Sequence, residues 1–157
     1  MEEQMARRLV AAEGKKLQQA GLVARTWGNI SCRIDENHFV ITPSGLDYET
    51  MTARDLVLMD IRNGVCCGAH KPSSEKGVHL AAYQTFPEVG YVIHTHQTYA
   101  TAIGLCGFEQ LAMTEEDAEK LGGIARAAYG LSSTEKLAGA VYDAMQSGAK
   151  VVFMVHH

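Results

Sequence analysis

The sequence predicts an α/β fold in which helices pack on the faces of a β-sheet. Two kinds of segment alternate along the chain. Short segments rich in apolar residues are bounded by turn residues, which is the pattern of β-strands. Longer segments carry apolar residues at helical spacing and begin with capping residues, which is the pattern of amphipathic helices. A mixture of strand pairs and separate helices favours a sheet covered by helices.

The first part of the chain is predicted to form two helices and three strands. Apolar residues at helical spacing cover residues 3–20, and Gly21 ends this helix. Strands are expected at residues 29–34, 38–42 and 56–61. Thr52 and Asp55 resemble a capping box and predict a helix start before the third strand. Asn63-Gly64 predicts a tight turn after that strand.

The second part of the chain is predicted to form four helices and two strands. The helices are expected at residues 73–86, at 97–105, from 114 onward and at 132–146. Ser73 or Ser74 is the expected cap of the first, and Ser132 with Glu135 forms a capping box for the last. The strands are expected at residues 90–96 and 150–155. The last strand is almost wholly apolar, so we expect it to be buried on both faces.

The composition is that of an ordinary globular protein. The chain has 157 residues, of which 46% are hydrophobic and 20% are charged, so we expect one domain with a sizeable core over residues 1–157. The net charge of -4 gives no electrostatic basis for binding nucleic acid or an anionic membrane. The charged N-terminal segment lacks the apolar stretch of a signal peptide, and no segment is long enough to span a bilayer. We therefore expect a cytoplasmic protein.

The cysteines also favour a reducing compartment. Cys66 and Cys67 are adjacent, which is unsuitable for a disulfide staple, and the sequence contains no C-x-x-C pair. We expect the four thiols to pack as small core residues rather than to bind metal, at Cys32, Cys66, Cys67 and Cys106.

The stretch YVIHTHQTYA, residues 91–100, contains two histidines one residue apart. Alternate residues of a strand point to the same face, so His94 and His96 form half of a metal site. The last apolar strand ends in His156 and His157, where a third imidazole is well placed, and imidazole ligands favour zinc or a similar divalent transition metal. An ordinary polar pair in the strand and a purification-tag remnant at the chain end also fit these residues. The remaining histidines are expected to be structural or exposed: His38, His70 and His79.

Three loops carry residues that suit an anion. In KPSSEKGVH, two serines and a glutamate lie at the expected start of a helix, where free backbone N–H groups and hydroxyls can hold a phosphate. WGNIS and TPSGL combine Gly, Asn, Ser and Thr beside strands, where backbone amides can bind anions. Taken alone, each segment is better explained by an ordinary helix cap or turn.

The order of these segments resembles the class II aldolase/adducin family, and within it the L-fuculose-phosphate aldolase type. The matching motifs are G-N-I-S, I-T-P-S-G, K-P-S-S-E, H-T-H and a terminal H-H after an apolar strand. The resemblance runs from about residue 5 to the last residue. It implies a three-layer αβα sandwich around a mostly antiparallel sheet, assembled as a homotetramer with sites between subunits. It also implies that the C-terminal part of the family fold is missing from this chain.

The resemblance assigns roles to individual residues. It implies that zinc, or another divalent transition metal, is held by His94, His96 and His157, with His156 as their neighbour. It implies that Glu75 is the acid/base residue. It implies that a substrate phosphate is held by Gly28, Asn29, Ser44, Gly45, Ser73 and Ser74.

The implied reaction is the cleavage of a phosphorylated ketose, such as L-fuculose 1-phosphate, to dihydroxyacetone phosphate and an aldehyde. A metal acting as a Lewis acid stabilises the enediolate, and a carboxyl group transfers the proton. A sugar-phosphate epimerase and a dehydratase of the methylthioribulose-phosphate type are alternatives on the same fold, and the epimerases carry aspartate at the position of Glu75. A non-catalytic adducin-like interaction domain is the other alternative, but such domains lose the metal histidines.

Two departures from the family pattern leave the phosphorylated sugar open. Residues 108–123 contain no tyrosine where the fuculose-type aldolases place one that acts across the subunit interface. The carboxylates in that neighbourhood are Glu115, Glu116 and Asp117. The resemblance also implies that this chain lacks the C-terminal segment that carries further active-site groups in the family, often a tyrosine.

Overall fold

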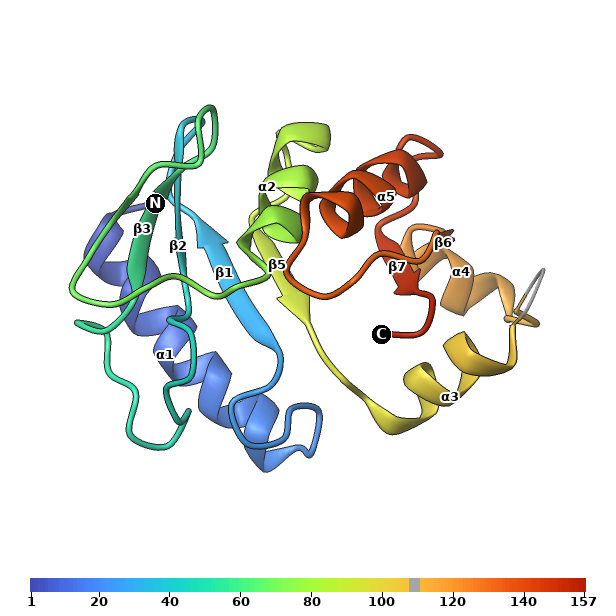
Figure 1. The fold of residues 1–157 in the computed structure, drawn as a ribbon, viewed down its shortest axis with the longest axis horizontal. Helices are drawn as coiled ribbons and strands as arrows, with labels where there is room; N and C mark the ends of the chain where they lie inside the picture. Colours follow the sequence, from blue (N-terminus) through green and yellow to red (C-terminus); the bar gives the residue numbers. More distant parts are fainter. Residues whose placement is uncertain (108–110) are drawn as a thin grey trace.

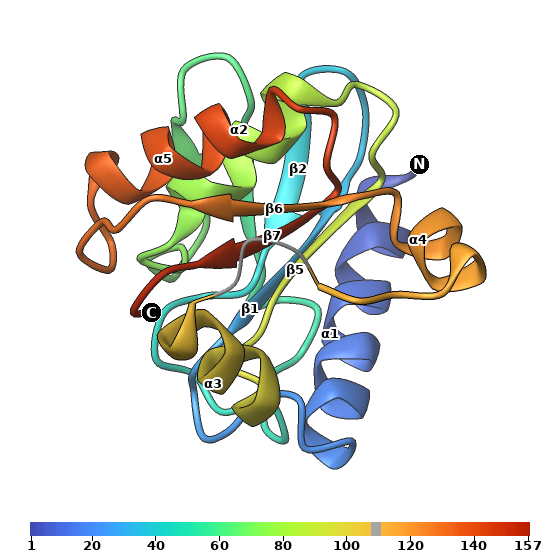
Figure 2. The same ribbon diagram turned by 90° about the vertical axis from the view of Figure 1, so that its right-hand side faces the viewer.

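The computed structural model describes residues 1–107 and 111–157, and its strands lie between helices (Figure 1). An antiparallel sheet has the strand order β4-β3-β2-β1-β5. Its strands are β1 (Asn29–Arg33), β2 (His38–Ile41), β3 (Val57–Asp60), β4 (Cys66–Cys67) and β5 (Tyr91–His94). A parallel pair forms a second, smaller sheet (Figure 2), made of β6 (Ile124–Ala127) and β7 (Val151–Met154).

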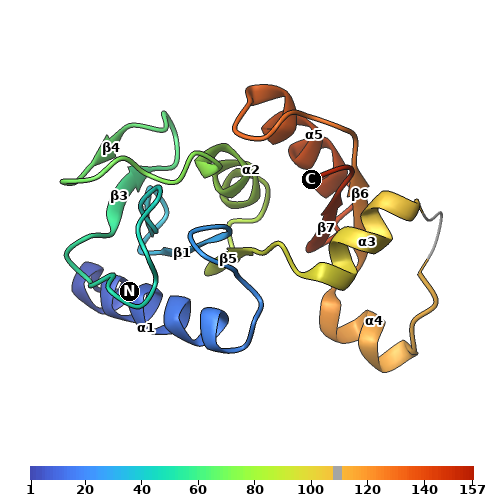
Figure 3. The ribbon, with the colours of Figure 1, turned by 60° about the horizontal axis from the view of Figure 1, so that its bottom comes forward.

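Helices cover both faces of the antiparallel sheet. In the described part of the chain they are α1 (Glu3–Gln19), α2 (Lys76–Thr85), α3 (Thr98–Cys106), α4 (Glu115–Leu121) and α5 (Glu135–Met145). Helix α1 lies along one face and α2 along the other (Figure 3), while α5 packs against α2 and the parallel pair. The predicted αβα sandwich with a mostly antiparallel sheet is therefore confirmed. None of the described helices combines the length and apolar character that crossing a membrane requires.

Alternation along the strands builds a separate core on each face of the sheet. Phe39 of β2 and Met59 of β3 pack with Tyr83 of α2. Val40, the neighbour of Phe39, points the other way and packs with Val10 of α1. The same alternation on β1 turns polar residues toward α2, and these residues form part of the candidate site.

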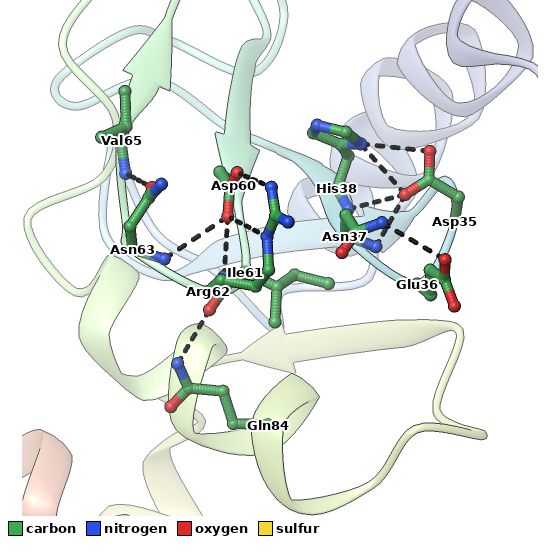
Figure 4. Close-up of polar contacts among 10 residues, drawn as sticks. All are labelled: Asp35, Glu36, Asn37, His38, Asp60, Ile61, Arg62, Asn63, Val65 and Gln84. Carbon is green, nitrogen blue, oxygen red and sulfur yellow. Dashed lines mark hydrogen bonds and ion pairs between the residues drawn. The ribbon is translucent and has the colours of Figure 1, made fainter.

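A hydrogen-bonded turn ties one end of the sheet to α2 (Figure 4). The carboxylate of Asp60 accepts a hydrogen bond from the Arg62 backbone N–H at 2.8 Å and one from its guanidinium at 2.9 Å. Asn63-Gly64 follows, with the glycine in the left-handed conformation, so the predicted tight turn is confirmed. The side-chain amide of Gln84 donates to the Ile61 carbonyl at 2.8 Å, which fixes α2 against this turn.

The predicted helix start at Thr52 was wrong. Both the backbone N–H and the hydroxyl of Thr52 donate to the Asp55 carboxylate, at 2.8 and 2.7 Å. The capping contacts therefore form, but they close only a turn, because strand β3 begins two residues later at Val57.

The predicted caps of two helices were also wrong. Helix α2 begins with Glu75 at its N-cap position, and Ser73 instead accepts a hydrogen bond from the Glu75 N–H. Helix α5 is capped by Thr134, whose hydroxyl accepts from the Leu137 N–H at 3.3 Å. Ser132 is therefore free of the capping role that the sequence suggested, and its hydroxyl serves the candidate site.

Two predictions of burial need correction. Cys32 is buried, but Cys66, Cys67 and Cys106 are exposed, because β4 is an edge strand and Cys106 ends α3 at the surface. The residues of β7 are half-buried rather than buried on both faces. The reason is that β7 pairs only with β6 within the described residues, which leaves its other edge open.

Leu137 anchors α5 to the fold and is 1% exposed in a cluster with residues of α2. We expect Leu137→Ala to lower the free energy of unfolding by about 2–5 kcal/mol, because truncation leaves a cavity. Chemical denaturation measures the change. The control is Leu131→Ala at a position that is 64% exposed, where the expected change is within about 0.5 kcal/mol. Equal losses in both variants would show that Leu137 is not a packing anchor.

Candidate functional site

Three histidines from distant segments bring one ring nitrogen each to a common point. His94 ends β5, His96 follows it, and His157 lies beyond β7, after a turn in which His156 has a left-handed backbone (φ 56). Nε2 of His94 lies 3.0 Å from Nε2 of His96 and 3.3 Å from Nε2 of His157. The ligand atoms of the three residues all lie within 4.8 Å of one another. The structure thus brings together the three histidines singled out in the sequence.

The spacing of these nitrogens fits a shared metal ion. Two nitrogens at tetrahedral positions, each 2.0–2.1 Å from one zinc ion, lie about 3.3 Å apart. Hydrogen bonding explains the arrangement less well, because Nε2 of His94 faces two other ring nitrogens and carries at most one proton. The same geometry gives the chain-terminal His157 a place inside the fold.

Glu75 adds a carboxylate to this cluster. Its Oε1 accepts hydrogen bonds from the Ser132 hydroxyl at 2.6 Å and from the Ser133 N–H at 2.8 Å. Its Oε2 is buried and has no hydrogen-bond partner among the described residues. This oxygen lies 3.5 Å from Nε2 of His94 and 3.3 Å from Nε2 of His157. A buried carboxylate oxygen without a partner, beside three imidazoles, fits a cation between them.

The charge states of these groups also suit a divalent cation. Burial lowers the pKa of His94 to about 4 and lowers the pKa of His96. Both rings are therefore neutral near pH 7, which is the form that binds metal. Burial raises the pKa of Glu75, but its contacts with His157 and Ser132 lower it further, to about 2. The ionised carboxylate of Glu75 and the neutral rings of His94 and His96 thus favour a bound cation.

A cavity of about 320 Å³ opens beside the metal cluster. Its lining includes His96, Glu75 and all six residues that the family resemblance assigned to the phosphate: Gly28, Asn29, Ser44, Gly45, Ser73 and Ser74. The volume is at the lower end of the range for small-molecule sites, about 300–1,000 Å³. The described lining contains no lysine or arginine, so an anion bound here interacts with hydroxyl, amide and backbone N–H groups.

Local backbone geometry shapes the loops around this cavity. Gly28 has φ 80, and a Cβ added there would lie 2.8 Å from the carbonyl oxygen of His94, so the close approach requires glycine. Gly45 also has a left-handed backbone, with φ 73. The Ser73 N–H donates to the Thr42 carbonyl at 3.1 Å, which ties the TPSGL loop to the KPSSE loop.

The sequence alone did not identify several residues that line or adjoin this site. Trp27 lines the cavity, in the same loop as the predicted Gly28 and Asn29. Ser132 belongs to a run of three hydroxyl residues, which is more than one helix cap needs. His79, taken as structural or exposed, is fully buried and contacts Asn29. The acidic residues Glu115, Glu116 and Asp117 are exposed in the first turn of α4 and are not part of the cavity lining.

Comparison with protein families and curated proteins gives two findings. The family described as class II aldolase and adducin N-terminal domain matches residues 8–157. The L-ribulose-5-phosphate 4-epimerase UlaF of Salmonella paratyphi C is 47% identical over 93 residues, which are 58% of this chain and 40% of that protein. The UlaF protein of Salmonella choleraesuis gives the same values. The matched region thus spans about two fifths of the length of these curated relatives.

Comparison with solved structures gives two further findings. An L-fuculose 1-phosphate aldolase is 33% identical, with a TM-score of 0.87, over 97% of this chain and 72% of that chain. The L-fuculose-1-phosphate aldolase of Thermus thermophilus is 25% identical, with a TM-score of 0.78, over 99% of this chain and 75% of that chain. These two solved structures are named for an aldolase, whereas the two curated relatives are named for an epimerase.

Proposed function

Since the chain belongs to the class II aldolase and adducin family, we propose that it carries the metal-dependent site of an enzyme that cleaves a phosphorylated ketose. The first candidate is an aldolase, which splits a substrate such as L-fuculose 1-phosphate into dihydroxyacetone phosphate and an aldehyde. One observation carries this proposal. Three imidazole nitrogens and the unpartnered Oε2 of Glu75 converge beside a cavity lined by polar loops.

The proposed ion is zinc or a similar divalent transition metal, held by His94, His96 and His157. Three imidazole ligands leave room for substrate oxygens, as in catalytic rather than structural zinc sites. When bound, the ion supplies a Lewis acid for negative charge that develops on the substrate's oxygens.

Glu75 is the proposed proton-transfer residue. When the bond between C3 and C4 of the ketose breaks, its electron pair remains on C3, and the C4 hydroxyl loses its proton to become an aldehyde. The Glu75 carboxylate, which is ionised at neutral pH, can take up the proton that the C4 hydroxyl loses and deliver it to C3. Ser132 and Ser133 bind Oε1 of Glu75, and this leaves Oε2 available on the side of the histidines.

The loops at Gly28-Asn29, Ser44-Gly45 and Ser73-Ser74 are the proposed phosphate site. In this proposal the loops hold the phosphate, while the histidines and Glu75 act on the reacting carbons. Binding energy gained at the phosphate then serves to orient the C3–C4 bond beside Glu75.

A sugar-phosphate epimerase is the second candidate, and the 47% identity with an L-ribulose-5-phosphate 4-epimerase favours it. The hydrogen on C4 of a 2-ketose is not acidic, because C4 is not adjacent to the carbonyl carbon. Inversion at C4 therefore requires the C3–C4 bond to break and form again. The two candidates thus share the first step, and they differ in whether the aldehyde leaves or is added back on its other face.

A product assay separates the two candidates. The chain is incubated with zinc and a panel of phosphorylated ketoses that includes L-fuculose 1-phosphate and L-ribulose 5-phosphate. Release of dihydroxyacetone phosphate, detected with a coupled dehydrogenase, supports the aldolase. Conversion of L-ribulose 5-phosphate to its C4 epimer without released dihydroxyacetone phosphate transfers the assignment to the epimerase. If neither product forms from any ketose in the panel, the proposal is contradicted.

Ser132 offers a further prediction, because its hydroxyl holds Oε1 of Glu75 at 2.6 Å. We expect Ser132→Ala to lower turnover by about 10-fold, the effect of losing one hydrogen bond to a charged group, with metal content unchanged. Ser132→Thr keeps the hydroxyl and should retain more activity than Ser132→Ala. The control is Ser147→Ala, at an exposed serine whose hydroxyl bonds the Ala144 carbonyl. Full activity of Ser132→Ala would show that Ser132 does not position Glu75.

A further inference from the structure

A buried chain of hydrogen bonds leads from α2 to the wall of the cavity. The Tyr83 hydroxyl lies 2.8 Å from Oγ of Ser31, and this Oγ lies 2.7 Å from Nδ1 of His79. Nε2 of His79 contacts Oδ1 of Asn29. All four residues are buried, and His79 and Ser31 are fully so. Asn29 and Ser31 alternate on β1 and therefore face α2, where His79 and Tyr83 lie one turn apart.

With Oδ1 of Asn29 facing His79, every bond in this hydrogen-bond chain has a defined direction. Oδ1 of Asn29 only accepts, so Nε2 of His79 must donate, and Nδ1 of the neutral ring then accepts from Ser31. The Ser31 oxygen in turn accepts from Tyr83. Burial keeps the His79 ring neutral, since it lowers the pKa to about 3.

The opposite orientation of the Asn29 amide is less favourable. With Nδ2 facing His79, every bond reverses, and the Tyr83 hydroxyl hydrogen is left without an acceptor among the described residues. A buried hydroxyl without an acceptor is destabilising. The hydrogen-bond chain therefore favours the orientation in which Oδ1 of Asn29 faces His79 and Nδ2 faces away from it.

We infer that His79 is a positioning residue that orients the Asn29 amide so that Nδ2 donates into the cavity, to the phosphate of the substrate. The inference rests on the proposed function, because it takes the cavity as a phosphate site. Asn29 lines this cavity, and its Nδ2 makes no hydrogen bond to the described residues. Without lysine or arginine in the described lining, neutral donors must hold the anion. The reversed amide presents an oxygen instead, which repels it.

Trp27 allows this inference to be tested without an assay of turnover. It is the only tryptophan in the sequence, it lines the same cavity, and its ring centre is 6.2 Å from that of His96. Titration with inorganic phosphate, followed by Trp27 fluorescence, gives a Kd for each variant. Repeating the titration with EDTA excludes a bound metal as the site at which phosphate binds.

We expect His79→Leu and Asn29→Ala each to raise the Kd for phosphate by about 10-fold or more, the effect of losing a hydrogen bond to a charged group. The double variant should bind no more weakly than Asn29→Ala alone, because His79 acts through Asn29. His79→Gln retains an N–H group near the position of Nε2 and should recover most of the affinity. Circular dichroism and zinc content verify that each variant is folded and intact.

Ser31→Ala keeps the inference testable if His79→Leu does not fold. It removes one hydroxyl that fixes the His79 tautomer, and it should also weaken phosphate binding. A folded His79→Leu or Ser31→Ala variant with the original Kd would overturn the inference, as would additive losses in the double variant. If the unchanged chain binds no phosphate, the phosphate site of the proposed function fails, and the inference fails with it.

Discussion

Glu75→Gln should lower turnover about 10²–10⁴-fold, the contribution typical of general acid–base catalysis, and should leave the metal in place. Glutamine preserves the shape of the side chain, and its carbonyl oxygen can still accept hydrogen bonds from Ser132 and Ser133. It replaces Oε2 by an NH₂ group, which cannot take up a proton from the substrate. The reacting carbon therefore loses its proton donor, while the three histidines are unchanged.

The rate is measured with the ketose that gives product, and the metal by elemental analysis of the same preparation. Glu88→Gln is the matched control, because Glu88 is exposed and pairs with Lys150 away from the cavity. Equal rates for Glu75→Gln and the unchanged chain would remove Glu75 from the mechanism. If Glu75→Gln lost the bound metal as well as its activity, Glu75 would instead be a metal ligand.

His94→Ala and His96→Ala should each abolish stable binding of one divalent ion per chain, and activity with it. Each substitution removes one of three ring nitrogens that lie within 4.8 Å of one another. Loss of a residue that only supports a ligand already costs about 10–100-fold in metal affinity, so loss of a ligand should cost more.

Metal analysis after dialysis measures this effect. The control is His70→Ala, because His70 is exposed and pairs with Asp55 outside the cluster. Metal content that stays the same in His94→Ala, His96→Ala and His70→Ala would show that these histidines are not the ligands.

Local sequence patterns predicted most of the fold. Apolar spacing identified α1, and alternation identified β1, because these patterns depend only on which face of an element is buried. The helix start expected at residue 114 is confirmed, and the Thr114 hydroxyl accepts a hydrogen bond from the Asp117 N–H. The position of the second, parallel sheet could not be read from the sequence, because it depends on contacts between distant segments.

The errors at the caps have a common physical cause. In the run Ser132-Ser133-Thr134, any of three hydroxyls could cap α5, and the choice depends on a carboxylate 57 residues away in sequence. Ser132 binds Glu75, so Thr134 takes the cap. Local capping preferences cannot predict the outcome of such a competition, because tertiary contacts decide which hydroxyl caps the helix.

Only part of the candidate site could be predicted, because the rest also depends on tertiary contacts. The histidines and the loop glycines stand out because their residue types suit metal and anion binding, and the structure brings them together. His79 does not stand out, because one histidine in a helix has no pattern around it. Its importance depends on the register of β1 against α2, which places Asn29 and Ser31 beside it.

The metal dependence of product release tests most directly whether His94, His96 and His157 form a metal centre that cleaves a phosphorylated ketose. The chain is assayed with the ketose that gives product, then after treatment with EDTA, and again after addition of zinc. Product release should fall to background with EDTA and return with zinc, and zinc should not restore His96→Ala. Product release that continues unchanged after complete removal of the metal would contradict the assignment.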